Sequence, residues 1–263
     1  WGHWTFFSFD GLNTRTPYNG VGGVFRLLPD GNQFSVVSRG LRNSCGLTFD
    51  RHFNLFTNDN DHEGMPAEYV PGRLVHVTPR SYFSWPRGWM VDKQPGRADM
   101  LETMNNDMGR AVPVGQSYYD EAFLPEEYRH NLLVARWGIR QLSRYSIDPH
   151  GASFKAKEHP VLVGHGQARP VDVTVGRGGR IFVTIAYMVH NEGSPTYRSD
   201  LVMITRADDP ANAPFEPYDA PTADREKLWS ELSQPSWWRR YRAHVELQRR
   251  YPHTSSSMRD EVF

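Results

Sequence analysis

The sequence predicts an all-β domain followed by a short α-helical segment. Residues 45–59 and 171–185 share one pattern: an apolar strand, a polar or Gly-containing turn, and a second apolar strand with an aromatic residue. Residues 132–146 add a third such pair of strands around Trp137 and Gly138. Units of this size form β-hairpins. Recurring hairpins indicate radial repetition, with which a β-propeller limits its exposed sheet edges. A β-sandwich with a chance likeness between hairpins is the alternative.

Shorter apolar runs indicate the remaining strands of this β domain, which we assign to residues 1–220. They lie at 24–28, 34–37, 74–77, 161–163 and 201–205. Residues 80–116 are rich in Pro, Gly, Met and Asn and show no clean periodicity. We therefore expect an inserted surface loop there.

Residues 221–263 have a helical pattern. Thr222 or Asp224 can cap a first helix, and Pro235 suits the first turn of a second. We interpret the arginines of 239–250 as a solvated face. Apolar positions follow the helical repeat and need a partner surface; they are Leu228, Trp229, Leu232, Trp238 and Val245. This segment is expected to pack outside the β domain as the start of another module.

Composition excludes several classes of function. The chain has 263 residues, a formal net charge of +0 and one cysteine, Cys45. Balanced charge argues against a general nucleic-acid binder. A single cysteine excludes an internal disulfide framework and a Cys-cluster metal site. No apolar run is long enough for a membrane span, and because the chain opens at Trp1 without a signal peptide we interpret it as a mature chain or an excised fragment.

The sequence lacks the motifs of several common enzyme and metal-binding classes. Residues 19–26, NGVGGVFR, precede a strand rather than a helix, so a tight turn is favoured over a phosphate loop. Residues 59–64, DNDHEG, begin like an EF-hand loop, but Val70 occupies the position that needs a bidentate carboxylate. No zinc-hydrolase HExxH or GxSxG elbow is present. Cys45 lies between predicted strand residues and is expected to be a small buried hydrophobe.

The stretch GLRNSCGLTFDRHFNLFTNDNDHEG, residues 40–64, holds the strongest functional signal. Arg42 and Asn43 precede the first hairpin, and an acid-rich loop follows it. Arg carries a planar, permanently charged fork suited to carboxylates. The acid-rich loop fits three roles: a metal site, a solvated turn, or the rim of a larger site. An Arg that pairs with an acid of a neighbouring sheet is the plain structural alternative.

This stretch resembles the blade motif of soluble glucose/sorbosone dehydrogenase-type quinoproteins, which are six-bladed β-propellers that use pyrroloquinoline quinone (PQQ) and calcium. It is more similar still to the membrane-bound dehydrogenase-like proteins of Planctomycetes and relatives, in which such a propeller precedes HEAT-like helical repeats and a c-type haem domain. The resemblance covers nearly the whole chain, with further similar stretches at 73–85, 115–138, 148–184 and 228–250. It implies the C-terminal half of a six-bladed propeller, then a HEAT-like repeat.

The resemblance assigns the cofactor site residue by residue. Arg42 and Asn43 match an Arg-Asn pair that contacts PQQ, and Arg136 falls near a cationic residue that contacts the quinone. Arg169 matches the first member of a later Arg-x-Arg pair. Val171 replaces the second member, which is a departure from the family pattern. Several arginines that converge at one channel mouth would neutralise the carboxylates of PQQ.

The same resemblance places calcium at the acid-rich loop, partly through backbone carbonyls. The candidate ligands there are Asn58, Asp59, Asp61 and Glu63. Calcium polarises the quinone carbonyl, and a His base removes the proton of the substrate hydroxyl. No catalytic residue can be assigned, because His3 lies too near the start of the sequence to align.

The implied function is a PQQ- and calcium-dependent oxidoreductase, located in the periplasm or otherwise outside the cytoplasm. It would oxidise a sugar or alcohol and pass electrons to a haem domain elsewhere in the parent protein. One alternative is a cofactor-less propeller that serves as a binding or scaffold module, which Val171 favours. A calcium-dependent lactonase-type hydrolase is the other, although it needs carboxylates from several blades and the sequence offers one cluster.

Overall fold

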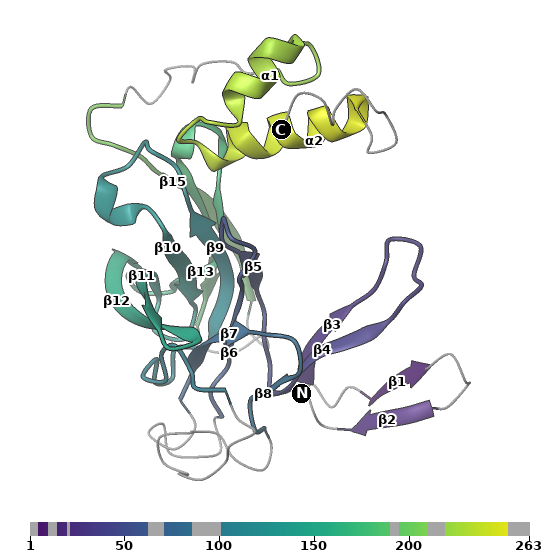
Figure 1. Ribbon diagram of the computed structural model, residues 1–263. Coiled ribbons are helices and arrows are strands. Elements are labelled where there is room, and N and C mark those ends of the chain that lie inside the picture. The colour runs from purple at the N-terminus through teal and green to yellow at the C-terminus, as the bar shows by residue number, and fades with distance from the viewer. Residues whose placement is uncertain are drawn as a thin grey trace. The chain divides into compact units, whose positions relative to one another are not determined.

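The computed structural model describes residues 5–9, 15–19, 22–62, 71–85, 101–189, 195–209 and 219–251. These residues are mostly β-sheet with two short α-helices (Figure 1). The chain divides into two compact units. The first contains residues 1–118, 130–174 and 183–202, and the second contains residues 119–129, 175–182 and 203–263.

Two small sheets lie at the start of the first unit. β1 (Thr5–Phe9) pairs antiparallel with β2 (Arg15–Asn19). β3 (Gly22–Arg26) pairs antiparallel with β4 (Ser35–Leu41), which pairs on its other side with the short parallel strand β8 (Ser81–Tyr82).

The sheet that carries the candidate site has the order β5-β6-β7. Its strands are β5 (Leu47–Phe49), β6 (Leu55–Asp59) and β7 (Arg73–Val77). Asp50 shapes the turn between β5 and β6, because its carboxylate accepts the N–H groups of His52 at 2.8 Å and Asn54 at 2.9 Å. Asx turns of this kind stabilise tight connections.

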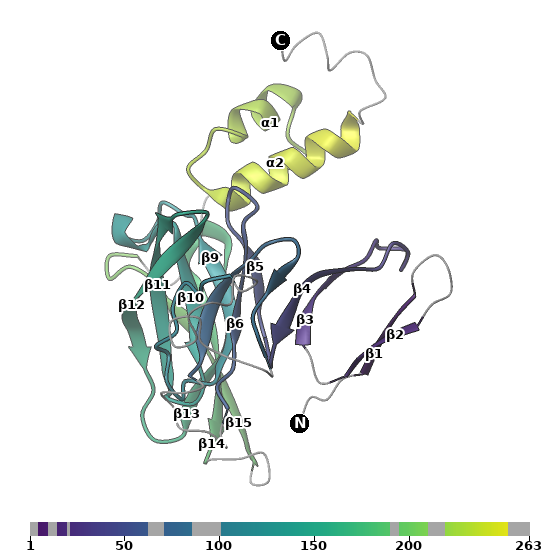
Figure 2. The same cartoon turned by 60° about the horizontal axis from the view of Figure 1, so that its bottom comes forward.

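The largest sheet has four strands in the order β12-β11-β10-β9. They are β9 (Pro113–Tyr119), β10 (Asn131–Arg136), β11 (Gln141–His150) and β12 (Ser153–Val163). Figure 2 shows β10, β11 and β12 side by side as antiparallel ribbons. All six residues of β10 are buried, as expected for an inner strand of a packed sheet.

The last sheet has the order β13-β14-β15. Its strands are β13 (Ala168–Val175), β14 (Ile181–Met188) and β15 (Pro195–Ile204). The three hairpins predicted from the sequence therefore correspond to β5–β6, β10–β11 and β13–β14, and they lie in three separate sheets. A single sandwich sheet that holds the first and last hairpins is excluded.

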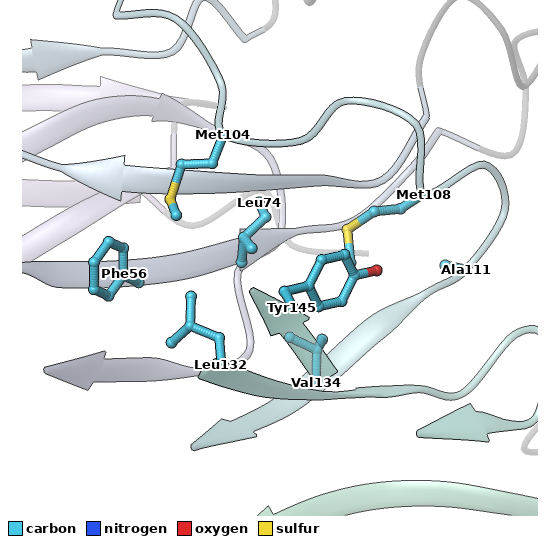
Figure 3. Packing of buried hydrophobic residues seen from close by; sticks show 8 residues of the cluster. All are labelled: Phe56, Leu74, Met104, Met108, Ala111, Leu132, Val134 and Tyr145. Atoms are coloured by element: carbon cyan, nitrogen blue, oxygen red, sulfur yellow. The ribbon is translucent and has the colours of Figure 1, made fainter. Parts of the chain in front are cut away.

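The main core of the first unit joins the β5-β6-β7 sheet to the four-stranded sheet (Figure 3). It is built from Phe56, Leu74, Met104, Met108, Ala111, Leu132, Val134 and Tyr145. The prediction of a surface loop over 80–116 was wrong for its second half, since Met104 and Met108 are each 2% exposed. Met104 N–H donates to Leu74 O at 2.9 Å, so tertiary pairing orders a segment that has no periodicity of its own.

The second unit contains both helices, α1 (Arg225–Glu231) and α2 (Trp237–Arg250). Asp224 caps α1 and Ser236 caps α2, so Pro235 precedes the cap instead of entering the first turn. Their shared core consists of Ala220, Leu228, Ala243 and Leu247, with Trp229, Leu232 and Trp238 packed against it. Val245 is 42% exposed and does not contribute, contrary to expectation. No described helix has the length and apolarity that a membrane crossing requires.

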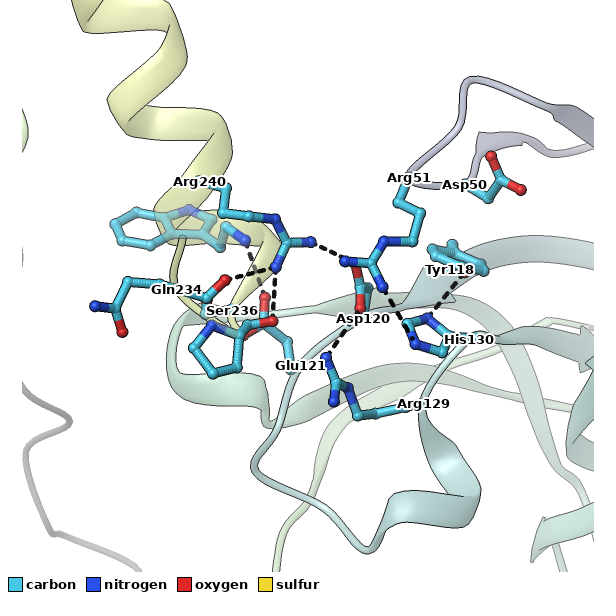
Figure 4. Close-up of polar contacts among 12 residues, drawn as sticks. Asp50, Arg51, Tyr118, Asp120, Glu121, Arg129, His130, Gln234, Ser236 and Arg240 are labelled. Carbon is cyan, nitrogen blue, oxygen red and sulfur yellow. Dashed lines mark hydrogen bonds and ion pairs between the residues drawn. The ribbon is translucent and has the colours of Figure 1, made fainter. Parts of the chain in front are cut away.

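Two arginines of α2, Arg239 and Arg240, bind buried carboxylates instead of lying on the predicted solvated face, whereas Arg249 is 66% exposed. Arg239 binds the carboxylate of Glu231, whose side chain is fully buried. Arg250 binds Glu246. Arg240 bonds the carboxylate of Asp120 and donates to Gln234 O at 2.7 Å (Figure 4). Within this unit the basic residues join segments of the chain to one another.

Candidate anion-binding site

Asp59, the last residue of β6, organises the candidate site. Its carboxylate accepts the backbone N–H of Arg42 at 3.0 and 3.1 Å and that of Asn43 at 2.8 Å. It also accepts from the guanidinium of Arg73 at 2.8 Å. Both Asp59 and Arg73 are fully buried. The structure therefore brings the Arg-Asn pair and the acid-rich loop together, but the carboxylate of Asp59 is already engaged by these N–H groups and by Arg73.

Asp61 links the same loop to the next segment of the chain. Its backbone carbonyl accepts a hydrogen bond from Nη1 of Arg42, whose guanidinium also lies 5.7 Å from the ring centre of Trp85. Its carboxylate accepts from Val112 N–H at 3.2 Å and from Nη1 of Arg110 at 3.3 Å. Asp61 thus accepts hydrogen bonds from two arginines, Arg42 and Arg110.

Arg169, on β13, is fixed by neutral acceptors. Its guanidinium donates to the backbone carbonyls of Trp137, Gly138, Met188 and Val189 over 2.9–3.1 Å. It also stacks over the Trp137 ring, with 4.4 Å to the ring centre. No acidic residue in the described part of the chain pairs with it. Burial, and next the charge of Arg140, lowers the pKa of the Arg169 guanidinium, because both disfavour its charged form.

A series of hydrogen bonds joins the neighbourhoods of Arg42 and Arg169. Val112 N–H donates to Asp61, Trp137 N–H donates to Val112 O at 3.1 Å, and Trp137 O accepts from Arg169. Glycine is required at position 138, because a Cβ there would lie 2.5 Å from the carbonyl oxygen of Arg110. We call this set, Arg42, Asp61, Trp85, Arg110, Trp137 and Arg169, the arginine rim.

Arg136 differs from the other predicted cofactor residues. Its guanidinium pairs with the carboxylate of Glu158 and donates to Met108 O at 3.0 Å, and the residue is only 5% exposed. Gln141 and Ser143 also donate to the carboxylate of Glu158, at 2.7 and 3.0 Å. This network ties β10, β11 and β12 together.

The predicted metal loop presents amide oxygens rather than carboxylates. Asn58 is fully buried, and its Nδ2 donates to Val114 O at 2.6 Å and Gln116 Oε1 at 3.0 Å. These bonds fix the amide, and its Oδ1 is buried without a hydrogen-bond partner among the described residues, as is Oδ1 of Asn60. No group of three or more His, Cys, Asp or Glu that could hold a metal occurs among the residues described. Glu63 lies outside them.

Sequence reasoning missed several residues of this site. Arg73 and Arg110 look like ordinary basic residues in a strand and a loop, and only their contacts assign them to the site. The sequence did hold a signal for Arg73, since this charged residue directly precedes the predicted strand at 74–77. In the structure all five residues of RLVHV are buried. Cys45 was predicted to be buried between strand residues. It is instead exposed and precedes β5.

The chain matches known proteins in structure but not in sequence. No protein-family model matches the chain, and no curated protein matches it. An oxidoreductase (glucose dehydrogenase) from Thermus thermophilus aligns at 20% identity and a TM-score of 0.50, over 64% of this chain and 47% of that one. A second glucose dehydrogenase structure aligns at 17% identity and 0.50, over 65% and 47%. The PQQ-bound aldose sugar dehydrogenase from Streptomyces coelicolor aligns at 20% and 0.48, over 62% and 45%.

What the chain shares with the two glucose dehydrogenases is the fold. The chain spans about half the length of the structures that it matches. Several separate, unclosed β-sheets and a half-length alignment together fit a partial propeller.

Proposed function

We propose that this chain is part of a quinoprotein-type oxidoreductase that oxidises a sugar or alcohol with PQQ and calcium. The observation that carries the proposal is the guanidinium of Arg169, held only by carbonyl oxygens and an indole ring within the described residues. A hydrogen-bond series connects its neighbourhood to that of Arg42. Positive charge that carbonyl dipoles fix but do not neutralise favours an anionic ligand.

The residues present fit a multiply charged carboxylate ligand. Arg42 and Asn43 would hold a carboxylate, because an arginine fork matches carboxylate geometry. Arg169, whose three nitrogens already donate to backbone carbonyls, would supply positive charge beside it. We assign Arg136 a supporting role near the cofactor, since its charge is neutralised by the carboxylate of Glu158. When bound, PQQ supplies an electrophilic quinone that accepts a hydride equivalent.

The carboxylates and the amide oxygens of the acid-rich loop differ in how well they could bind calcium. Asp59 is engaged by Arg73 and two backbone N–H groups, and Asp61 by Arg110 and Val112. Oδ1 of Asn58 and Oδ1 of Asn60 are buried, and neither has a hydrogen-bond partner in the part of the chain that the structure describes. Calcium accepts amide and backbone carbonyl oxygens as ligands. We therefore propose that these two amide oxygens face the cation and that Asp59 and Asp61 shape the loop around it.

From the resemblance in the sequence we further propose that the chain belongs to the planctomycete group and that residues 221–263 begin a HEAT-like repeat. The same resemblance supports a haem domain as the electron acceptor and a location outside the cytoplasm. The fold likeness to glucose dehydrogenases supports a sugar as the small-molecule substrate. The boundary near residue 220 also stays a prediction.

A cofactor-less binding or scaffold module is the second candidate. The Arg136–Glu158 pair favours it, since a charge that the sequence assigned to the quinone is neutralised within the protein. Val171, 38% exposed on β13, points the same way because it offers no charge where the family pattern has arginine.

The deciding experiment uses the full-length parent protein, because the chain spans about half of the structures it matches. Purified protein is incubated with PQQ and calcium, and a panel of aldoses and alcohols is tested with an artificial electron acceptor. We expect turnover that requires both additions and is lost in Arg169→Ala. The absence of PQQ binding would overturn the proposal and favour the cofactor-less module, whereas tight PQQ binding without turnover would refute the oxidation of the substrates in the panel.

A further inference from the structure

We propose that Arg110 is a ligand-recognising residue of the arginine rim and that, together with Arg42, it binds one carboxylate of an anionic ligand. This inference rests on the proposed function, because the same rim is involved. It begins with the position of Arg110, which contacts the residue that also holds Arg42. Nη1 of Arg42 bonds to the Asp61 carbonyl, and Nη1 of Arg110 bonds to the Asp61 carboxylate.

The contact between Arg110 and Asp61 is long for an ion pair, and the arginine is the more exposed partner. Its length of 3.3 Å exceeds the roughly 2.7–2.9 Å that is typical of charge-assisted hydrogen bonds. The Arg110 side chain is 39% exposed, whereas that of Asp61 is only 1% exposed. The acid is therefore fixed, and the arginine keeps part of its side chain at the surface, where an added anion can reach it.

Backbone contacts hold Arg110 beside the rest of the rim. Its Nη1 also donates to His62 O at 2.7 Å, next to Asp61. Its own carbonyl lies so close to Gly138 that a Cβ there would meet it at 2.5 Å, and Gly138 O accepts from Arg169. Arg110 thus lies between the segments that position Arg42 and Arg169, where a ligand that contacts both would meet it.

The test measures anion binding to the full-length protein by calorimetric titration with PQQ, citrate and formate. The variants are Arg110→Ala and Arg110→Lys. Arg206→Ala is the matched control, because Arg206 is 46% exposed and likewise pairs with an acid, Asp208. We expect Arg110→Ala to weaken PQQ binding at least tenfold and Arg206→Ala to leave it within twofold. Lysine should restore part of the affinity, since it keeps the charge but lacks the planar fork.

A purely structural role of Arg110 would not change how affinity responds to salt. If Arg110 contacts the ligand, binding by Arg110→Ala should weaken less steeply with added salt than binding by the unmodified protein. Unchanged PQQ affinity in Arg110→Ala, or an unchanged salt dependence, would overturn the inference. Citrate binding that depends on Arg110, without PQQ binding, would uphold it and overturn the PQQ function. Failure to bind any of the three anions would overturn both.

Discussion

Arg73 and Asp59 form an ion pair with no exposed side-chain surface, in which Nη2 of Arg73 lies 2.8 Å from Oδ2 of Asp59. The same guanidinium donates to Phe83 O at 2.7 Å and Gly40 O at 3.1 Å. The same carboxylate holds the backbone N–H groups of Arg42 and Asn43. The pair therefore fixes the backbone on which the rim is built. Its burial is tolerated because both partners have their polar atoms bonded.

Replacement of Arg73 by Met should destabilise the first unit strongly. Removal of one partner from a buried pair leaves an uncompensated charge and costs about 3–5 kcal/mol. Denaturant unfolding measures the loss, and hydrogen exchange should show faster exchange of the Arg42 and Asn43 amides. Arg180→Met is the matched control, because Arg180 pairs with Asp209 at 9% and 7% exposure in the second unit. Equal amide protection in Arg73→Met and the unmodified protein would contradict the positioning role.

The thiol of Cys45 should be a poor nucleophile at neutral pH. Partial burial, and next the carboxylate of Asp59, raises the pKa of this thiol although the residue is exposed overall. The neutral thiol reacts slowly. Alkylation by iodoacetamide across a pH series should therefore show a midpoint above that of the unfolded chain. Asp59→Asn should lower the midpoint, and a midpoint at or below the unfolded value would refute the assignment.

The second unit should lose stability as pH rises above the ordinary titration range of glutamate. Burial raises the pKa of Glu121, whose carboxylate accepts Trp238 N–H at 3.0 Å. The native state then binds more protons than the unfolded state between the unfolded and folded pKa values, so stability falls with rising pH in that window. Glu121→Gln should remove this slope while it keeps an acceptor for the helix. Helical circular dichroism during denaturation at several pH values gives the slope, and an identical slope in the variant would exclude Glu121 as its source.

Met104 should contribute to stability as a core residue. It is 2% exposed in the main cluster, so Met104→Ala should cost about 2–5 kcal/mol through lost burial and a cavity. Met203, 36% exposed, serves as the control and should change stability little on the same substitution. Comparable losses in both variants, measured by denaturant unfolding, would speak against an ordered core role for residues 101–112.

The hairpins were predictable because their signals are local. Alternating apolar runs and turn chemistry, such as the Asp50 turn, lie within a few residues of one another. Residues 101–112 were not predictable, since their burial depends on pairing with β7, far away in sequence. Propensity and periodicity carry no information on such contacts.

The candidate site divides along the same line. The Arg42-Asn43 pair could be found as a motif, and the structure brings it to Asp59 and Asp61. The partners of each charge could not be found, because ion pairs depend on side chains from distant segments. Arg136 and Arg169 look alike in sequence, yet one faces a carboxylate and the other four carbonyls.

We propose that the arginine rim binds a multiply charged carboxylate, and direct titration of PQQ tests this binding. The full-length protein, Arg42→Ala, Arg169→Ala and Arg144→Ala are compared by fluorescence or calorimetry in the presence of calcium. Arg144, which donates to Asn131 Oδ1 at 3.0 Å in the β10–β11 hairpin, serves as the control. We expect saturable binding that weakens at least tenfold in Arg42→Ala and Arg169→Ala and is unchanged in Arg144→Ala. No binding by the unmodified protein, or equal affinity in all four proteins, would contradict it.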